Sequence, residues 1–382
     1  MKRRSLLVLV LTGISSIVSN GVRDLRPAIA APVARAERVV LVVFGGGVRA
    51  KEFLGRPDLC PTVKAIGAAG SASEGWASAG SDPTDATKGI LIARSVPVVT
   101  PGRVRPDQPT VFECARRGLR LDEGRIWFAS YADGEALDLA RSDHADYGEV
   151  YAPSLAVGEG PFGERLRGLF RLFGRPNLTK EKTWAFLRDL RRATAQASAV
   201  PGVDDAGTDE GMRLERALLE EVDRRAADIG GAAALDARAM RAGITVLRLF
   251  RPALLVIRLG QADVGSQGLA AYEEVLRRDD QELARLRAEI AADPVLRATT
   301  TLIVMTDLGR DAKPNAAGGY GRADGSLEAT TCAVACEGPG VRKGAIPRAP
   351  RDVRDVAPTV AKLLGFEMPL AEGRAREDWI GR

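Results

Sequence analysis

The sequence has 382 residues, of which 45% are hydrophobic and 5% aromatic. This is enough apolar material for one large α/β domain, or for one domain with a cap, and it excludes a disordered chain. The formal net charge of +5 comes from residues 1–36, which hold six of the 55 basic side chains and one of the 50 acidic ones. Because the rest of the chain is balanced, there is no electrostatic case for nucleic-acid binding.

Residues 1–36 are organised like an export signal. A basic start at residues 2–4 precedes an apolar stretch at 6–18, and a small-x-small cleavage sequence ends at Ala36. The apolar stretch is short for a membrane span. The paired arginines fit a twin-arginine signal and an ordinary secretory one equally well, whereas the charged residues at 23–26 are atypical of either. We expect export to the periplasm or the extracellular space, with an uncleaved N-terminal anchor as the alternative and the only expected membrane attachment.

The following chain, residues 37–382, alternates apolar runs with helical patterns. Periodicity predicts one amphipathic helix at 271–293 and a C-terminal packing helix between Asp355 and Gly365. Continuous apolar strands separated by helices are typical of parallel sheets covered on both faces. The predicted fold is therefore a three-layer α/β sandwich with a mostly parallel central sheet and a helical insertion. Its predicted strands are 38–44, 125–130, 253–260, 300–307 and 331–338.

Residues 150–245 interrupt the alternation with an arginine-rich, helix-like pattern followed by a charged helical pattern near 212–229. We interpret them as a helical insertion packed on the sheet. Alternatively, the Phe, Leu and Arg residues between 162 and 175 form a basic amphipathic surface for a membrane or a partner.

The four cysteines, at 60, 114, 332 and 336, are too scattered for a zinc ribbon. Cys332 and Cys336 fall on one face of a predicted strand, and we interpret all four as small buried thiols. In an exported chain a pair could instead be oxidised. The only histidine, His144, lies in a polar segment far from every motif discussed below.

Several motifs occur in a characteristic order along the chain: FGGGVR, SDPTDATKG, LGQADVGSQG, MTDLGRD and GGYGRADG. In this order and spacing they resemble landmarks of the alkaline phosphatase superfamily, which includes sulfatases, nucleotide pyrophosphatases and phosphopentomutases. The resemblance covers residues 38–100 and 245–375. It implies an α/β fold and hydrolysis of phosphate or sulfate esters by a Thr, Ser or modified Cys nucleophile beside two metal ions held by Asp and His.

Compared with that pattern, the chain lacks most of the expected metal ligands. The family's first-strand aspartate is replaced by Gly45, and its histidines by Gln267, Leu308 and Arg322, the last of which could also align as Ala323. A di-zinc centre draws heavily on imidazole, and hydrolysis by two metals needs both ions. We therefore expect no two-zinc site.

Some carboxylates and one hydroxyl do match the pattern. Asp263, Asp307 and Asp324 could hold a single Mg²⁺ or Ca²⁺, or could simply cap backbone N–H groups. Thr84 occupies the nucleophile position, with Thr87 as the alternative, at a predicted helix N-terminus that favours anions but also commonly carries a capping residue. Strand-end residues of an α/β sheet share one crevice, so we expect these positions to converge.

Two neighbouring features have simpler interpretations. We interpret the glycines at 45–47 as a tight turn rather than an anion cradle, because the P-loop and GxGxxG spacings are absent. Arg310 and Lys313 could bind an acidic ligand, but we interpret them as solvated loop charges.

These residues predict a catalytically degenerate relative of the hydrolases that keeps the fold and cleft to bind an unknown ligand or protein partner. The alternative is an active phosphatase or sulfatase with a histidine-free or single-metal site. A third hypothesis is a structural role in the cell envelope through residues 150–245.

Overall fold

The structure is a computed structural model, and it describes residues 35–96, 105–130, 138–157, 235–322 and 324–381. Nearly all of the expected export segment, residues 1–34, lies outside this range. Within the described ranges, no helix has both the length and the apolar character needed to cross a bilayer.

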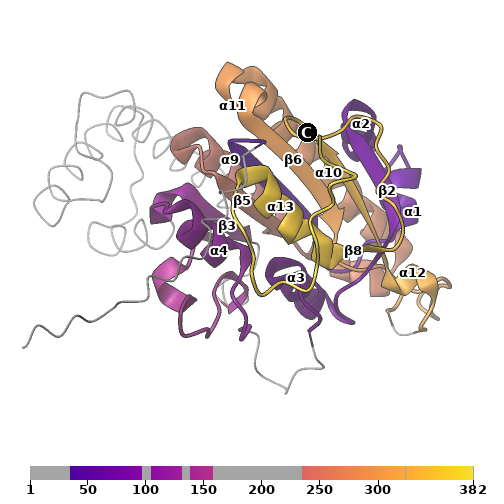
Figure 1. The fold of residues 1–382 in the computed structure, drawn as a ribbon. Coiled ribbons are helices and arrows are strands. Elements are labelled where there is room, and N and C mark those ends of the chain that lie inside the picture. Colours follow the sequence, from indigo (N-terminus) through magenta and orange to yellow (C-terminus); the bar gives the residue numbers. More distant parts are fainter. Residues whose placement is uncertain (1–34, 97–104, 131–137, 158–234, 323, 382) are drawn as a thin grey trace, which may run out of the picture. The chain divides into compact units, whose positions relative to one another are not determined.

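Eight strands form one mixed sheet in the order β4-β3-β5-β1-β6-β7-β2-β8 (Figure 1). The run from β4 to β6 is entirely parallel, β7 is antiparallel to both β6 and β2, and β8 is parallel to β2. The predicted α/β fold with a mostly parallel sheet is confirmed. The strands are β1 Arg38–Phe44, β2 Ser71–Ala77, β3 Ile126–Ser130, β4 Ser154–Val157, β5 Leu254–Leu259, β6 Thr300–Thr306, β7 Thr331–Glu337 and β8 Arg351–Asp352.

The central strands are buried along their whole length because helices cover both faces of the sheet. Every residue of β1, β5 and β6 is buried, which explains their continuous β-branched and aliphatic sequences. The covering helices are α1 Ala50–Gly55, α2 Pro61–Ala69, α3 Pro83–Ile92, α4 Val111–Leu119, α9 Leu235–Phe250, α10 Leu269–Ala292, α11 Pro294–Thr299, α12 Leu327–Thr330 and α13 Val356–Leu364.

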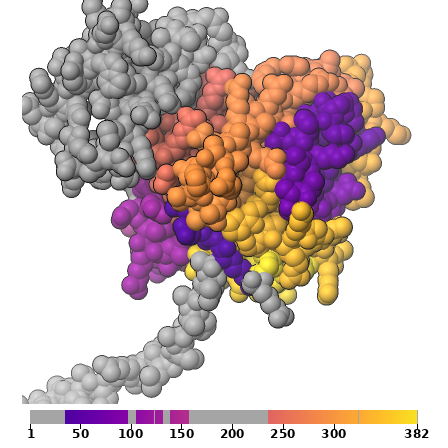
Figure 2. Space-filling model, turned by 90° about the horizontal axis from the view of Figure 1, so that it is seen from above, coloured from indigo at the N-terminus to yellow at the C-terminus, as the bar shows by residue number. Residues whose placement is uncertain are grey.

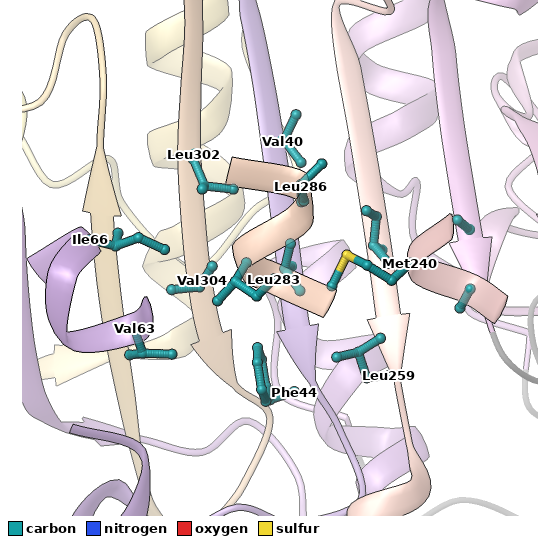
Figure 3. Packing of buried hydrophobic residues seen from close by; sticks show 14 of the residues in the cluster. Val40, Phe44, Val63, Ile66, Met240, Leu259, Leu283, Leu286, Leu302 and Val304 are labelled. Carbon is teal, nitrogen blue, oxygen red and sulfur yellow. The ribbon is translucent and has the colours of Figure 1, made fainter. Parts of the chain in front are cut away.

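Two apolar clusters separate the layers. One contains alternate β1 residues such as Leu41 together with α3, α4 and α13, and the other contains the intervening ones, such as Val42, with α1, α2, α9 and α10. Figure 3 shows the second cluster, in which α10 presents Leu283 and α9 presents Met240 to the strands. The space-filling view in Figure 2 shows α2, in indigo, close to the orange α10–α11 segment. The three layers follow from the alternation of side chains along each strand.

The helix predictions agree with the structure to within two residues. The helix expected at 271–293 is α10, and the C-terminal helix is α13, which ends at Gly365 with φ +83°. All four cysteines are buried free thiols, with Cys332 and Cys336 in the same apolar cluster. The predicted burial of the thiols is therefore confirmed.

The bounds expected for the helical insertion, 150–245, need correction at both ends. The strand β4 pairs with β3 at the sheet edge, and α9 packs on β3 and β5. The residues of β4 and α9 therefore belong to the sandwich, because their apolar side chains complete its layers. Residues 158–234, which include the proposed basic amphipathic surface, lie outside the described residues.

Candidate functional site

The carboxyl ends of β5, β1 and β6 lie side by side and bring three loops together. Gly45 N–H donates to the Leu259 carbonyl over 3.1 Å, and Asp307 N–H donates to the Phe44 carbonyl over 3.3 Å. The loop after β6 also reaches the 3₁₀ helix η3, Gln261–Ser266, where Tyr320 N–H donates to the Gly265 carbonyl over 2.8 Å. Strand ends separated widely in sequence therefore form one polar site, as expected for this type of sheet.

The carboxylate of Asp307 is completely buried and bound by backbone amides. Its Oδ2 accepts from Gly46 N–H over 3.1 Å, and its Oδ1 accepts from Gly47 N–H over 3.2 Å and from Leu308 N–H over 2.7 Å. Burial raises the pKa of Asp307 to about 6, while the positive charge of Arg258 and these amides favour its ionised form. The strand thus ends on a carboxylate that holds the glycine loop of another strand.

The glycine loop fits around Asp307 only because it lacks side chains. A Cβ on Gly45 would lie 2.4 Å from the Leu259 carbonyl oxygen and 3.2 Å from Asp307 Oδ2, and Gly46 and Gly47 have φ +85° and +84°. These dihedrals favour glycine. The sequence interpretation of a tight turn was incomplete, since the loop cradles an anion that is part of the protein itself.

Arg310 is fully buried beneath this loop, so its interpretation as a solvated charge was wrong. Its Nε donates to the Gly47 carbonyl over 2.7 Å, its Nη1 to Tyr320 over 2.7 Å, and its Nη2 to Gly46 and Ala262 over 2.6 Å each. The guanidinium also lies over the Tyr272 ring, 5.6 Å from its centroid. One cation therefore joins all three loops.

A second arginine, Arg322, pairs with Asp263, another of the three retained carboxylates. Arg322 Nη1 lies 2.7 Å from Asp263 Oδ1 and donates to the Gly46 carbonyl over 3.2 Å. Asp263 keeps 61% of its side chain exposed, and Arg310 Nη2 is 3.8 Å from the same oxygen. Position 322, where the resemblance implies a histidine ligand, instead places a guanidinium against the aspartate.

The remaining ligand positions do not complete a metal site. Asp324 is exposed, accepts from Ala312 N–H over 3.0 Å and from Ser326 N–H over 2.8 Å, and its hydrogen bond with the Ser326 side chain lowers its pKa. Leu308 is buried, and Gln267 is exposed. No group of three or more His, Cys, Asp or Glu side chains suited to a metal ion occurs in the described ranges. This donor set does not fit the family's metal centre.

The nucleophile position lies at the start of α3. Asp82 caps this helix by accepting from the backbone N–H groups of Thr84 and Asp85 over 2.9 and 3.1 Å. Thr84 is half-buried, whereas Thr87 is fully buried and accepts from Arg258 Nε over 3.2 Å. Of the two candidate hydroxyl groups, only that of Thr84 belongs to a residue with solvent-accessible surface.

Sequence reasoning missed the side chains that organise the site. Arg258 belongs to an apolar strand run, and nothing in its pattern distinguishes it from an edge charge. Arg49, also buried, pairs with Glu52 over 2.7 Å, and its guanidinium lies 3.6 Å from the Tyr320 ring centroid. Tyr272, on the predicted apolar face of α10, accepts from Arg49 N–H over 3.1 Å. Of these residues, only Tyr272 could have been found from the sequence, because it lies on the apolar face of the predicted helix.

His144 takes no part in this site. Its Nδ1 accepts from Asp146 N–H over 3.2 Å, and its ring packs edge-on against Tyr147 with centroids 5.2 Å apart, beside α4. The single imidazole of the chain therefore lies among local contacts, as its position in the sequence indicates.

Comparison with solved structures identifies the fold. An alkaline phosphatase, a PafA variant with four substitutions, matches with a TM-score of 0.54 and 11% identity over 91% of this chain and 100% of that one. The phosphonate monoester hydrolase SpPMH from Silicibacter pomeroyi matches with a TM-score of 0.50 and 13% identity, over 89% and 75%. A 2-O GAG sulfatase matches with a TM-score of 0.50 and 8% identity, over 89% and 73%. No family model and no curated protein matches the sequence. The resemblance to the alkaline phosphatase superfamily is thus confirmed at the level of the fold.

Proposed function

We propose that this protein is a non-hydrolytic relative of the phosphoester and sulfoester hydrolases, and that it uses their fold to bind a ligand or a protein partner. The observation that carries the proposal is the set of backbone hydrogen bonds to the Asp307 carboxylate. Both of its carboxylate oxygens accept backbone N–H groups, from Gly46, Gly47 and Leu308. A carboxylate has about four acceptor positions, and these amides fill three of them. A metal ion bound by both oxygens would have to displace at least one amide, and each lost hydrogen bond to a charged group costs about 1.5–3 kcal/mol.

The electrostatics of the site support the same conclusion. In a two-metal hydrolase the ions activate the nucleophile and stabilise the leaving oxygen. Here the fixed positive charges near the strand ends are guanidinium groups, and Arg310 is engaged by four backbone carbonyls. A guanidinium cannot generate a hydroxide or alkoxide nucleophile as a bound metal does, so this arrangement supports binding rather than hydrolysis.

A direct assay tests the proposal. The purified protein is incubated with chromogenic phosphate monoesters, phosphate diesters and sulfate esters, with Zn²⁺, Mg²⁺, Mn²⁺ or Ca²⁺ added separately. We expect no turnover above the metal-only background and no difference between the wild type and Thr84→Ala. Metal-stimulated turnover that Thr84→Ala abolishes would establish the alternative, a hydrolase with a histidine-free site.

We also propose that the chain is exported, because residues 1–36 combine a basic start, an apolar stretch and a small-x-small sequence. Expression with a C-terminal tag followed by cell fractionation and mass spectrometry tests this. The expected product is extracytoplasmic and begins near residue 37. A full-length chain in the membrane fraction would establish the anchor instead.

A further inference from the structure

A hollow of about 440 Å³ lies beside the edge of the sheet, between α4, the segment before residue 144, and β4. In the strand order, β4 and β3 separate this edge from the strand-end site of β5, β1 and β6. The hollow combines charged and apolar walls. Its principal lining residues are Arg116, Ala140, Arg141, Glu149, Val150 and Leu155.

The position of its two arginines is fixed by one buried carboxylate. Glu113 of α4 accepts from Thr110 N–H over 2.6 Å, which forms the capping box of the helix, and from Ser142 N–H over 2.7 Å and Ser142 Oγ–H over 3.0 Å. Because Glu113 is fully buried, it clamps the segment carrying Arg141 onto the helix carrying Arg116. Such preorganisation is what a binding site requires.

Each of the two arginines retains hydrogen-bonding capacity. The Nε–H groups of Arg116 and Arg141 are removed from solvent and have no hydrogen-bond partner among the described residues. On Arg116, Nη1 donates to the Ala152 carbonyl, so the Nη2 group is the donor left for a ligand in the hollow. The nearest counter-ion is weak, because Glu149, 3.2 Å from Arg141 Nη1, has 85% of its side chain exposed.

We propose that this hollow binds a small organic anion, with its carboxylate or phosphate group between Arg116 and Arg141. The Nη–H groups of the two planar guanidiniums donate to the oxygens of such a group. Ala140, Val150 and Leu155 form the apolar wall that accepts a short hydrocarbon substituent. Glu149 is displaced when the anion enters, since both compete for Arg141. This site is independent of the function proposed for the strand ends.

Titration calorimetry and thermal unfolding of the purified full-length protein test the inference with matched probes. Hexanoate and hexyl phosphate carry an anion and a tail, inorganic phosphate lacks the tail, and hexanol lacks the charge. We expect saturable one-to-one binding of one of the first two, weaker binding of inorganic phosphate and none of hexanol. The comparison of hexanoate with hexyl phosphate distinguishes the two oxyanions.

Three variants locate the binding site. Arg141→Gln and Arg116→Gln should weaken binding at least about tenfold, the equivalent of one lost charged hydrogen bond, and Glu149→Gln should strengthen it by removing the competing carboxylate. Arg117→Gln is the matched control, because Arg117 lies exposed on the same helix and stacks on Tyr147 outside the hollow.

Several results would overturn the inference. These are equal stabilisation by hexanol and by the anions, equal loss in Arg117→Gln and Arg141→Gln, or binding that is weakened in Glu149→Gln. If Arg116→Gln does not unfold cooperatively, Arg141→Gln and Glu149→Gln decide the outcome, since neither residue belongs to α4.

Discussion

Arg310 carries a charge that burial opposes, and desolvation accordingly lowers its pKa. Four backbone carbonyls and the Tyr272 ring compensate for the lost water. Those carbonyls belong to the loops after β1, β5 and β6, which Arg310 therefore ties together. At the residue scale, a side chain that looks like an ordinary loop charge in the sequence is the centre of the strand-end site.

We predict that Arg310→Leu lowers the free energy of unfolding by at least about 3 kcal/mol, because it leaves buried carbonyl groups unsatisfied. Arg310→Lys should recover only part of the loss, since an ammonium cannot reproduce the planar fork. Urea unfolding measures the change. Arg322→Gln is the control, and its partly exposed ion pair should cost no more than about 1 kcal/mol. An Arg310→Leu midpoint equal to that of the control would contradict the role assigned to Arg310.

A second prediction concerns Gly45, where the family resemblance implies an aspartate. Restoring it with Gly45→Asp should destabilise the protein rather than create a metal ligand, because the new Cβ would lie 2.4 Å from the Leu259 carbonyl oxygen and would bring a second acid towards Asp307. Gly45→Ala isolates the steric cost from the charge. Thermal unfolding with and without Zn²⁺ measures both effects. Stabilisation of Gly45→Asp by Zn²⁺ would show that the metal site implied by the resemblance can form in this chain.

At the scale of elements, carboxylates from α10 fix the neighbouring helices. The N-cap residue of α2, Cys60, makes no side-chain cap, and Asp280 supplies one by accepting from Thr62 N–H over 2.9 Å and Val63 N–H over 3.0 Å. One residue earlier, Asp279 is hydrogen-bonded to Asp236 of α9, and Asp236 also accepts from Gly260 N–H over 2.7 Å. Two buried acids in contact share a proton, since both cannot ionise cheaply.

This pair makes stability depend on pH. Burial raises the pKa of Asp236 to about 6, although the positive charge of Arg258 opposes the shift. Burial also raises the pKa of Asp279 well above its usual value; the charge of Glu282 adds to this shift, and Arg278 opposes it. The folded state therefore binds protons more tightly than the unfolded state, so the pair's contribution falls as pH rises from about 4 through about 6.

We predict that Asp279→Asn raises the free energy of unfolding at pH 8 relative to wild type and has a smaller or opposite effect at pH 4.5. In this variant the side-chain amide still donates a hydrogen bond to Asp236, and the carboxyl group that must lose its proton at high pH is absent. Urea unfolding at pH 4.5, 6 and 8 provides the measurement. Arg278→Gln, which removes a neighbouring charge but no acid, is the control. Parallel pH profiles for wild type and Asp279→Asn would rule out the shared proton.

Whether a feature could be predicted from the sequence depended on its physical origin. Continuous apolar runs gave β1, β3, β5, β6 and β7, because strands buried on both faces need them. The strands β2, β4 and β8 were not predicted, since SASEGWA is small and polar, SLAV is a short edge segment, and β8 has only two residues, both charged. The position of Asp307 at a strand end was predictable, but its partners were not, because Gly46 lies 261 residues away and a backbone amide leaves no mark in a sequence pattern.

At the scale of the whole molecule, the loops after β1, β5 and β6 are joined by hydrogen bonds within the chain. Asp307 binds the glycine loop, Arg310 joins all three loops, and Arg322 neutralises Asp263. In an alkaline phosphatase-like fold with metal ions, the charge of the ions holds such carboxylates together. Here Asp307 and Asp263 have N–H partners within the chain, so we expect these loops to form without an ion.

The last prediction follows from the fact that these loops are joined by hydrogen bonds within the chain. An ion that binds the folded state alone stabilises it by about 2.7 kcal/mol at a hundred times its Kd, which corresponds to a rise in Tm of roughly 4 °C for a domain of about 350 residues. We expect no such rise with Zn²⁺, Mg²⁺ or Ca²⁺, and no fall with EDTA. Asp307→Asn should lower Tm equally with or without ions, because it disrupts the bonds to the glycine loop, whereas Asp263→Asn should change it little. A saturable rise in Tm with Mg²⁺ or Ca²⁺ that disappears in Asp307→Asn would mean that the carboxylate exchanges its backbone partners for an ion, and the histidine-free hydrolase would then be the better account of the protein.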